Sequence, residues 1–264
     1  MTFVQGDCFE LIKTLRDESV DLVLTSPPYA DLKSYGDFKG IAPDDYVEWI
    51  LPLIHEIYRV LKPTGSFILN INDKVESRFR HPFVFDLISR IHKDTKFKMF
   101  ERLFWNKMKG LPVQKRFGDR VEFVFWFVKG RDFVFNLDAM RTPYSEVSLK
   151  RMQKPIKARF VRSLEDDEGY KEWKPNAKGA LPTTLVSISS ETKRIADTHI
   201  AVFPEAFVEY FLLGSTNEGA IVLDPFLGTG TTAVVCAKHS RQCVGFEQSA
   251  VYLDGVRTRV GALR

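Results

Sequence analysis

The stretch "AIVLDPFLGTGTTAVVCAKH" (220–239) decides the fold, because it holds a strand, a glycine-rich turn and a helix in immediate succession. Its first four residues (220–223) form a short apolar run, which is typical of a buried strand. Gly228 and Gly230 allow a tight turn and a close approach of the backbone to a ligand. The helix after the turn leaves free N–H groups at its start, and these suit a negative group such as a carboxylate.

Glu247 ends the next strand-like run, QCVGFE (242–247), nineteen residues after Gly228. At this position an acid accepts hydrogen bonds from the two hydroxyls of a ribose. Asp224 would repel a pyrophosphate but attract an ammonium group, and the glycines are not followed by the lysine of a P-loop. The segment therefore predicts a nucleoside cofactor that carries an amino acid joined through a sulfonium. The alternative is a plain glycine turn without a ligand.

Strand-like and helix-like runs alternate through most of the chain. Strand-like runs lie at 3–6, 20–25, 65–71, 97–105, 121–128, 220–224 and 242–247, and helix-like runs at 7–15, 44–61, 81–93, 204–213, 230–239 and 249–260. This order predicts an α/β, Rossmann-like fold: a seven-stranded, mostly parallel sheet with helices on both faces. The runs near 97–128 have no helix between them, so one strand there should be antiparallel.

The alternation stops between residues 131 and 197, where apolar runs are few and charges are many. The segment RMQKPIKARFVR (151–162) holds five basic residues and no acidic one. Because the regular pattern returns afterwards, we expect one discontinuous domain, 1–130 with 198–264, interrupted by an inserted region, 131–197.

Composition places few restrictions on function. The 264 residues carry a net charge of +4, a mildly basic balance that is compatible with an anionic partner. Three separated cysteines without a C-x-x-C pair, and scattered histidines, predict reduced thiols and no metal site. Neither a signal peptide nor an apolar run of about 18 residues is present, so we expect a cytoplasmic protein that does not bind membranes.

A second unusual stretch, "LTSPPYADL" (24–32), follows the buried-looking run VDLVL. Two consecutive prolines end a strand and stiffen the backbone beyond it, because neither has an N–H group to donate. Ser26 and Tyr29 therefore stand on a rigid tip at the carboxyl end of a strand, which is where ligands bind in such folds. Taken alone, the stretch favours a rigid turn without a function.

Together, "TSPPY" and "DPFLGTGTT" resemble the signature pair of the DNA amino-methyltransferases that use S-adenosylmethionine (SAM), and their order resembles the circularly permuted β class. "GDCFELIKTL" and "HIAVFPEAFVEYFL" are similar to two further family segments. The resemblance implies SAM as cofactor, with an acid for its adenine at Asp7 and a segment around Pro204 that closes over its methionine end. The implied cofactor-binding residues are Asp7, Thr25, Phe203, Pro204, Glu205, Asp224, Pro225, Phe226, Gly228, Gly230, Thr231, Thr232 and Glu247.

The resemblance also implies catalysis by Ser26, Pro27, Pro28 and Tyr29. Side-chain and backbone oxygens of the tip would hold the amine of a flipped base, Tyr29 would stack on that base, and the amine would take the methyl group directly. No covalent intermediate forms, so Cys8 is not needed as a nucleophile. Many adenine-modifying members carry Asp or Asn where this chain has Ser26, which favours cytosine N4 as the target; adenine N6 is the alternative.

Duplex DNA is the implied partner, and residues 131–197 stand where the family places its target recognition region. Basic residues near these segments are predicted to contact phosphates: Lys107, Lys115, Arg116, Arg120, Arg151, Lys154, Arg159 and Arg162. A restriction endonuclease of the same specificity, a prokaryotic or phage source and a monomer or homodimer would accompany this function. Rival interpretations are methylation of an RNA base or a protein glutamine, a cofactor-free DNA-binding module, and a nicotinamide oxidoreductase, which leaves SPPY unexplained.

Overall fold

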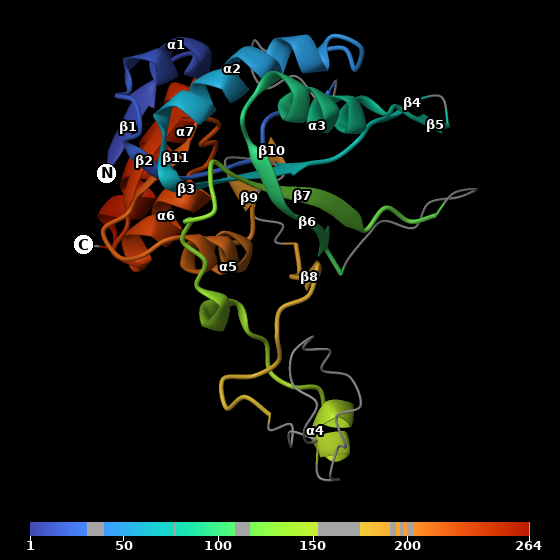
Figure 1. The fold of residues 1–264 in the computed structure, drawn as a ribbon. Coiled ribbons are helices and arrows are strands. Elements are labelled where there is room, and N and C mark those ends of the chain that lie inside the picture. The colour runs from blue at the N-terminus through green and yellow to red at the C-terminus, as the bar shows by residue number, and fades with distance from the viewer. Residues whose placement is uncertain are drawn as a thin grey trace.

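The computed structural model describes residues 1–30, 40–76, 78–108, 117–152, 175–190, 194–195, 198–199 and 203–263. Its centre is one eight-stranded sheet with the order β1-β12-β11-β2-β3-β7-β6-β8 (Figure 1). The strands are β1 (Thr2–Gln5), β2 (Val20–Thr25), β3 (Leu61–Ile71), β6 (Lys98–Asn106), β7 (Val121–Val128), β8 (Leu185–Ser187), β11 (Ile221–Asp224) and β12 (Gln242–Glu247).

One strand, β7, runs against all the others of this sheet. It pairs antiparallel with β3 and with β6, whereas the remaining pairs are parallel. This confirms the predicted mostly parallel sheet with one antiparallel strand. Because β2 lies directly beside β11, with Leu22 opposite Val222 and Val23 opposite Leu223, the two sequence motifs leave the sheet at the same edge.

Helices cover both faces of the sheet, as the alternating pattern predicted (Figure 1). One face packs against α1 (Cys8–Leu11), α2 (Tyr46–Val60) and α3 (Phe83–Asp94), and the other against α5 (Glu205–Ser215), α6 (Thr231–Lys238) and α7 (Ala250–Gly261). Successive residues of β2 alternate between the two cores: Val23 joins the first, and Leu22 and Leu24 the second. A strand buried on both faces reads as one apolar run, which explains VDLVL.

The sheet has eight strands in the described part of the chain, where seven were predicted. The additional strand, β8, lies in the region 131–197 and pairs with the outer side of β6. It has only three residues, of which only Val186 is buried, so it gives no periodicity that a sequence pattern can reveal. Two small hairpins were also not predicted, β4 (Val75–Glu76) with β5 (Phe79–Arg80) and β9 (Arg194–Ile195) with β10 (Thr198–His199).

Parts of the inserted region pack on the body of the protein. Met140 is buried in the core under α5, and Asn136 donates from its side chain to the carbonyl oxygens of Leu213 and Thr216. The short helix α4 (Glu146–Met152) has no buried residue and lies away from the sheet (Figure 1). No helix among the described residues has the length and apolar character needed to span a membrane.

Candidate active site

The Ser26–Tyr29 tip directly follows β2 and is held in place by a contact with α2. Pro27 is buried, and the carbonyl oxygen of Pro28 accepts a hydrogen bond from the Tyr46 hydroxyl at 2.9 Å. Tyr46 is fully buried at the start of α2. Two prolines and one anchored carbonyl leave the tip little freedom, which suits a group that must hold a substrate in one geometry.

The hydroxyl of Tyr29 lies at the centre of a polar cluster. It lies 2.8 Å from Oε2 of Glu122, 3.1 Å from Oδ1 of Asn70 and 3.3 Å from Oγ of Ser26. Burial, together with the nearby charge of Glu122, raises the pKa of Tyr29 well above its usual range. The phenol is therefore protonated at neutral pH, and its oxygen is fixed close to Ser26.

Glu122 and Asn70 are site residues that sequence reasoning missed. Glu122 is the second residue of β7, in a pattern, VEFVFWFV, that predicts only a strand, and Asn70 lies inside β3. Their approach to Tyr29 follows from the pairing of β3 with β2 and with β7, which brings three strands together at one edge. Apart from that strand order, no signal in the sequence joins them.

Lys107, predicted to contact phosphate, forms an ion pair with Glu122. Its Nζ lies 2.9 Å from Oε1, and the Lys107 and Glu122 side chains are 23% and 12% exposed. Of the other predicted phosphate contacts, Arg120 precedes β7 on the exposed surface and Arg151 is exposed on α4. Five more lie outside the described residues: Lys115, Arg116, Lys154, Arg159 and Arg162.

The glycine loop follows β11 at the same edge. Gly228 and Gly230 have φ values of +53° and +79°, in the left-handed region that favours glycine. A Cβ atom at position 230 would lie 2.5 Å from a methyl group of Val256, so α7 packs directly against this turn. The next residue, Thr231, begins α6.

Asp224 ties the loop to the end of β2. It is 3% exposed, and its carboxylate accepts from Thr25 Oγ1 at 2.8 Å, Thr232 Oγ1 at 2.7 Å and the Phe226 N–H at 3.2 Å. Burial raises the pKa of Asp224 to about 6, although these three donors act in the opposite direction. Sequence reasoning gave this acid an ammonium partner; in the structure, three internal donors surround it.

Two further carboxylates lie at the ends of the neighbouring strands β12 and β1. Glu247 accepts from the N–H groups of Gly228 and Ser249, both at 2.9 Å, with one bond to each oxygen. Asp7 caps α1 by accepting from the Phe9 N–H at 2.9 Å. A carboxylate offers about four lone-pair positions, so both acids keep capacity for a ligand's hydroxyl or amine.

The segment before the loop is placed by α5. Phe203 stacks on Phe207 with ring centroids 4.9 Å apart, and Pro204 caps the helix. Glu205 is bound to cations of the next two helices, Lys238 at 2.5 Å and Arg259 at 3.6 Å. Its carboxylate thus joins α5, α6 and α7. Two further predicted cofactor contacts follow β11: Pro225 is buried, and Phe226 is half-buried.

Comparison with known proteins identifies the family. The family model N6_N4_Mtase, described as "DNA methylase", matches residues 20–257. The chain belongs to this family of DNA methylases. It is 29% identical to the type II methyltransferase M.BglII of Bacillus subtilis and to M.PvuII of Proteus hauseri; in each case the match covers 94% of this chain, and it spans 66% and 80% of those proteins.

Solved structures share the fold of this DNA methylase. PvuII DNA methyltransferase (cytosine-N4-specific) superimposes with a TM-score of 0.74 at 23% identity, covering 97% of this chain and 85% of the other. The crystal structure of the M1.HpyAVI–SAM complex gives a TM-score of 0.59 at 21% identity, covering 98% of both chains. The methylase is SAM-dependent, as the resemblance implied.

The residues present fit SAM. Thr231 Oγ1 is buried and has no hydrogen-bond partner in the described part of the chain, at the start of α6. Buried hydroxyls are nearly always paired, so this one indicates a place where a ligand's polar group completes the site. Backbone N–H groups at a helix start suit the methionine carboxylate, and Glu247 and Asp7 suit the ribose and adenine.

The cysteines of the methylase are not suited to act as nucleophiles. Cys8, Cys236 and Cys243 are free and buried, and burial raises the pKa of Cys8 to about 12. A thiol with this pKa is protonated at neutral pH and is a poor nucleophile. Within the described ranges, no cluster of His, Cys, Asp or Glu has the composition of a metal site.

A hairpin after the carboxyl end of β3 carries exposed groups that sequence reasoning also missed. Phe79 is 78% exposed in the β4–β5 hairpin, which follows the carboxyl end of β3. Arg80 binds Asp73 and, at 3.1 Å, Asp119, and so fixes the hairpin to the segment before β7. Phe117 in that segment is 99% exposed. Aromatic side chains are therefore exposed both in this hairpin and in the segment before β7.

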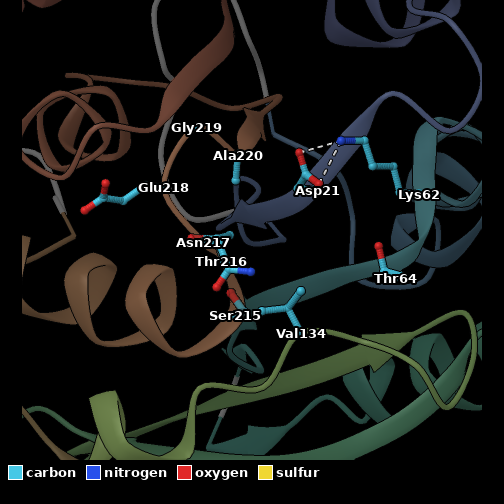
Figure 2. Close-up of a pocket in the computed structure, with 10 residues that line it drawn as sticks. All are labelled: Asp21, Lys62, Thr64, Val134, Ser215, Thr216, Asn217, Glu218, Gly219 and Ala220. Carbon is cyan, nitrogen blue, oxygen red and sulfur yellow. Dashed lines mark hydrogen bonds and ion pairs between the residues drawn. The ribbon is translucent and has the colours of Figure 1, made fainter.

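A cavity of about 240 Å³ lies at the opposite edge of the sheet, where β2 and β11 begin (Figure 2). Asp21 and Lys62 line it and neutralise one another, with Lys62 Nζ 2.8 Å from both carboxylate oxygens. Asp21 also accepts from the Ile221 N–H at 2.8 Å. These charges hold β2, β3 and β11 together, and the cavity is separate from the tip and the glycine loop.

Proposed function

We propose that the methylase transfers a methyl group from SAM to the exocyclic N4 amine of cytosine in duplex DNA. The observation that carries the proposal is the position of Ser26: its hydroxyl stands on a rigid tip that Thr25 and Asp224 tie to the glycine loop. The target amine and the cofactor would therefore meet at one edge of the sheet.

Bound SAM supplies an electrophilic methyl group on a sulfonium. The chain's own part is to position the amine. Ser26 Oγ and the carbonyl oxygen of Pro27 would each accept one N–H, so that the nitrogen lone pair faces the methyl group. The amine nitrogen would take the methyl group directly, the cofactor would leave as a neutral thioether, and the excess proton on nitrogen would pass to solvent. No enzyme nucleophile takes part, in agreement with the high pKa of Cys8.

The target amine is stacked and paired within a duplex, so the base must flip out, at a cost of roughly a few kcal/mol. Tyr29 would contact the flipped ring, since base–aromatic contacts contribute about 1–3 kcal/mol. The exposed hairpin with Phe79 and the basic surface at Arg120 are proposed to hold the duplex beside the tip. Residues 131–197 are proposed as the region that reads the sequence.

Adenine N6 is the second candidate target, and the names of relatives support both. One solved relative is called cytosine-N4-specific, and a relative from Escherichia coli (strain K12), 28% identical over 96% of this chain, is called DNA adenine methyltransferase YhdJ. The type II names of several relatives support a restriction–modification context, with an endonuclease of the same specificity as partner. Ser26 is the reason for preferring cytosine.

Nucleoside analysis tests the proposal. The protein is incubated with genomic duplex DNA and SAM carrying a deuterated methyl group, and the DNA is digested and its nucleosides are identified by mass. We expect labelled N4-methylcytosine. Labelled N6-methyladenine would keep the mechanism and reject the base assignment. Transfer to RNA but not to duplex DNA would reject the substrate class.

A further inference from the structure

The direction of the hydrogen bonds around Tyr29 can be worked out from its three neighbours. A phenol has one proton to donate. The bond from the Tyr29 hydroxyl to Glu122 Oε2 is the shortest of the three, at 2.8 Å, and ends on a carboxylate. Charge-assisted bonds of this kind are about twice as strong as neutral ones, so the phenol proton lies on the Glu122 side.

Asn70 cannot supply a proton to the phenol. Its Nδ2 donates to the carbonyl oxygen of Phe123 at 3.1 Å, which leaves Oδ1 facing Tyr29 at 3.1 Å. Oδ1 is an acceptor, as are both oxygens of Glu122. Of the three groups around the phenol oxygen, only the hydroxyl of Ser26 can donate to it. The proton of Ser26 therefore points toward Tyr29.

Lys107 fixes the far end of this series of hydrogen bonds. Its ammonium donates to Oε1 of Glu122 at 2.9 Å, while Oε2 receives the phenol. Both carboxylate oxygens are thus engaged, and the side chain is only 12% exposed. Because this acceptor is charged, largely buried and held from two sides, the series of hydrogen bonds has one direction: Ser26 donates to Tyr29, and Tyr29 donates to Glu122.

We propose that Glu122 is a positioning residue that makes Ser26 a hydrogen-bond acceptor for the target amine. This inference rests on the proposed function. An aspartate at position 26 would accept bonds in any orientation, but a serine hydroxyl can donate as well as accept. With its proton committed to Tyr29, Ser26 presents only lone pairs to the amine, and a primary amine needs acceptors for its two N–H groups. Glu122 thereby does indirectly what a carboxylate at position 26 would do directly.

The substitution Glu122→Gln tests this. A glutamine has nearly the same shape but can donate to the phenol oxygen, which removes the fixed direction. We expect kcat to fall by about 10- to 100-fold, with KM for DNA and the SAM dissociation constant within about twofold of wild type. The matched control is Glu218→Gln at the opposite edge of the sheet, which should leave kcat unchanged. A wild-type kcat for Glu122→Gln would overturn the inference.

A double-mutant cycle separates positioning from a general structural role. Tyr29→Phe removes the hydroxyl that connects Glu122 to Ser26. If Glu122 acts on Ser26 through the Tyr29 hydroxyl, adding Glu122→Gln to Tyr29→Phe lowers kcat by less than about threefold, because the connection is already lost. If Glu122 serves only to hold β7 in place, the two losses multiply. Fully multiplicative losses would therefore overturn the inference.

A second readout needs neither DNA nor SAM. In the free protein, ring-carbon NMR of Tyr29 follows its titration, because burial and the Glu122 charge raise the pKa of this phenol well above its usual range. Glu122→Gln removes that charge, so the titration should move to lower pH. An unchanged titration would overturn the inference even if the wild type methylated no DNA. Absence of methylation by the wild type would reject the proposed function instead.

Discussion

The glycine loop and the Ser26–Tyr29 tip lie at one edge of the same sheet but are assembled differently. In the loop, the bonds from Thr232 to Asp224 and from Gly228 and Ser249 to Glu247 all lie within one short segment, 224–249. The tip instead collects Ser26 and Tyr29 after β2, Asn70 from β3, Lys107 after β6 and Glu122 from β7. The glycine loop is therefore held mainly by residues that are close in sequence, and the polar cluster around Tyr29 depends on long-range packing.

This difference has a consequence for mutations. Changes in the loop should act on SAM affinity and on folding, because the loop is part of one core between β11, α6 and α7. Changes at the tip should act on turnover. The bond from Thr25 to Asp224, 2.8 Å long and buried, is the direct link between the two regions.

Ser26→Ala should show the largest effect. It removes one of two acceptors for the amine, and loss of one such group typically lowers kcat by roughly 10²- to 10³-fold. Steady-state methyl transfer measures this, and the SAM dissociation constant should stay within about twofold. The control is Ser19→Ala, in a turn where the hydroxyl bonds only to the backbone oxygen of Arg16. Equal loss of SAM affinity and of kcat in Ser26→Ala would remove the distinction between the regions.

Asp224 should give the loop a pH-dependent contribution to stability. Its pKa rises from 3.8 in the unfolded chain to about 6 in the fold, so its stabilising contribution is present below 3.8 and is lost as pH rises through 6. The difference corresponds to about 3 kcal/mol. The side chain of Asp224→Asn carries no titrating proton. Its free energy of unfolding in urea, relative to that of wild type, should therefore rise by about this amount between roughly pH 3.5 and pH 7.5. If the free energies of unfolding of both proteins changed with pH in the same way, the burial of this acid would be contradicted.

Gly230→Ala should destabilise the loop by steric contact. The new methyl group would lie 2.5 Å from Val256, and overpacking of this kind costs about 1–3 kcal/mol. Gly219→Ala is the matched control, because Gly219 has a similar φ of +78° but nothing within 4 Å of the added carbon. Both variants bear the left-handed strain, so the difference between their unfolding free energies isolates the contact with α7. Equal losses of unfolding free energy in the two variants would show that α7 shifts to accommodate the added methyl group.

Lys107 and Arg120 offer the smallest but most discriminating comparison. Lys107→Ala should lower kcat by about tenfold through Glu122 and leave the salt dependence of DNA binding unchanged. Arg120→Ala should leave kcat unchanged at saturating DNA and reduce the slope of log K against log salt by about one phosphate contact. Methyl-transfer kinetics measure kcat, and fluorescence anisotropy over a range of salt concentrations measures the slope. A reduced slope for Lys107→Ala would instead show that this lysine contacts a DNA phosphate.

The sequence predicted most of the structure that depends on neighbouring residues. The strand 242–247, the glycine turn and the helix after it are specified by apolar runs, turn residues and capping groups within a few positions. The antiparallel place of β7 was also predictable, because a short connection allows little else. The strand β8 and the β4–β5 hairpin were not, since each is too short to show a period.

The tip was predictable only in part. Two prolines reveal a rigid strand end, but nothing near Ser26 indicates which groups orient it. Lys107 was interpreted as a phosphate contact because a lysine's charge alone does not specify its partner, and the strand order supplies Glu122 as that partner. Asp224 was expected to face an ammonium, and its three internal donors come from residues whose approach depends on the fold.

The most direct test of the division between the two regions is calorimetric titration of SAM into three proteins: wild type, Ser26→Ala and Thr231→Val. Thr231→Val keeps the shape of α6 but removes the buried hydroxyl that has no partner among the described residues. We predict that wild type and Ser26→Ala bind SAM equally and that Thr231→Val binds about tenfold more weakly. Weakened binding in Ser26→Ala with unchanged binding in Thr231→Val would contradict the account.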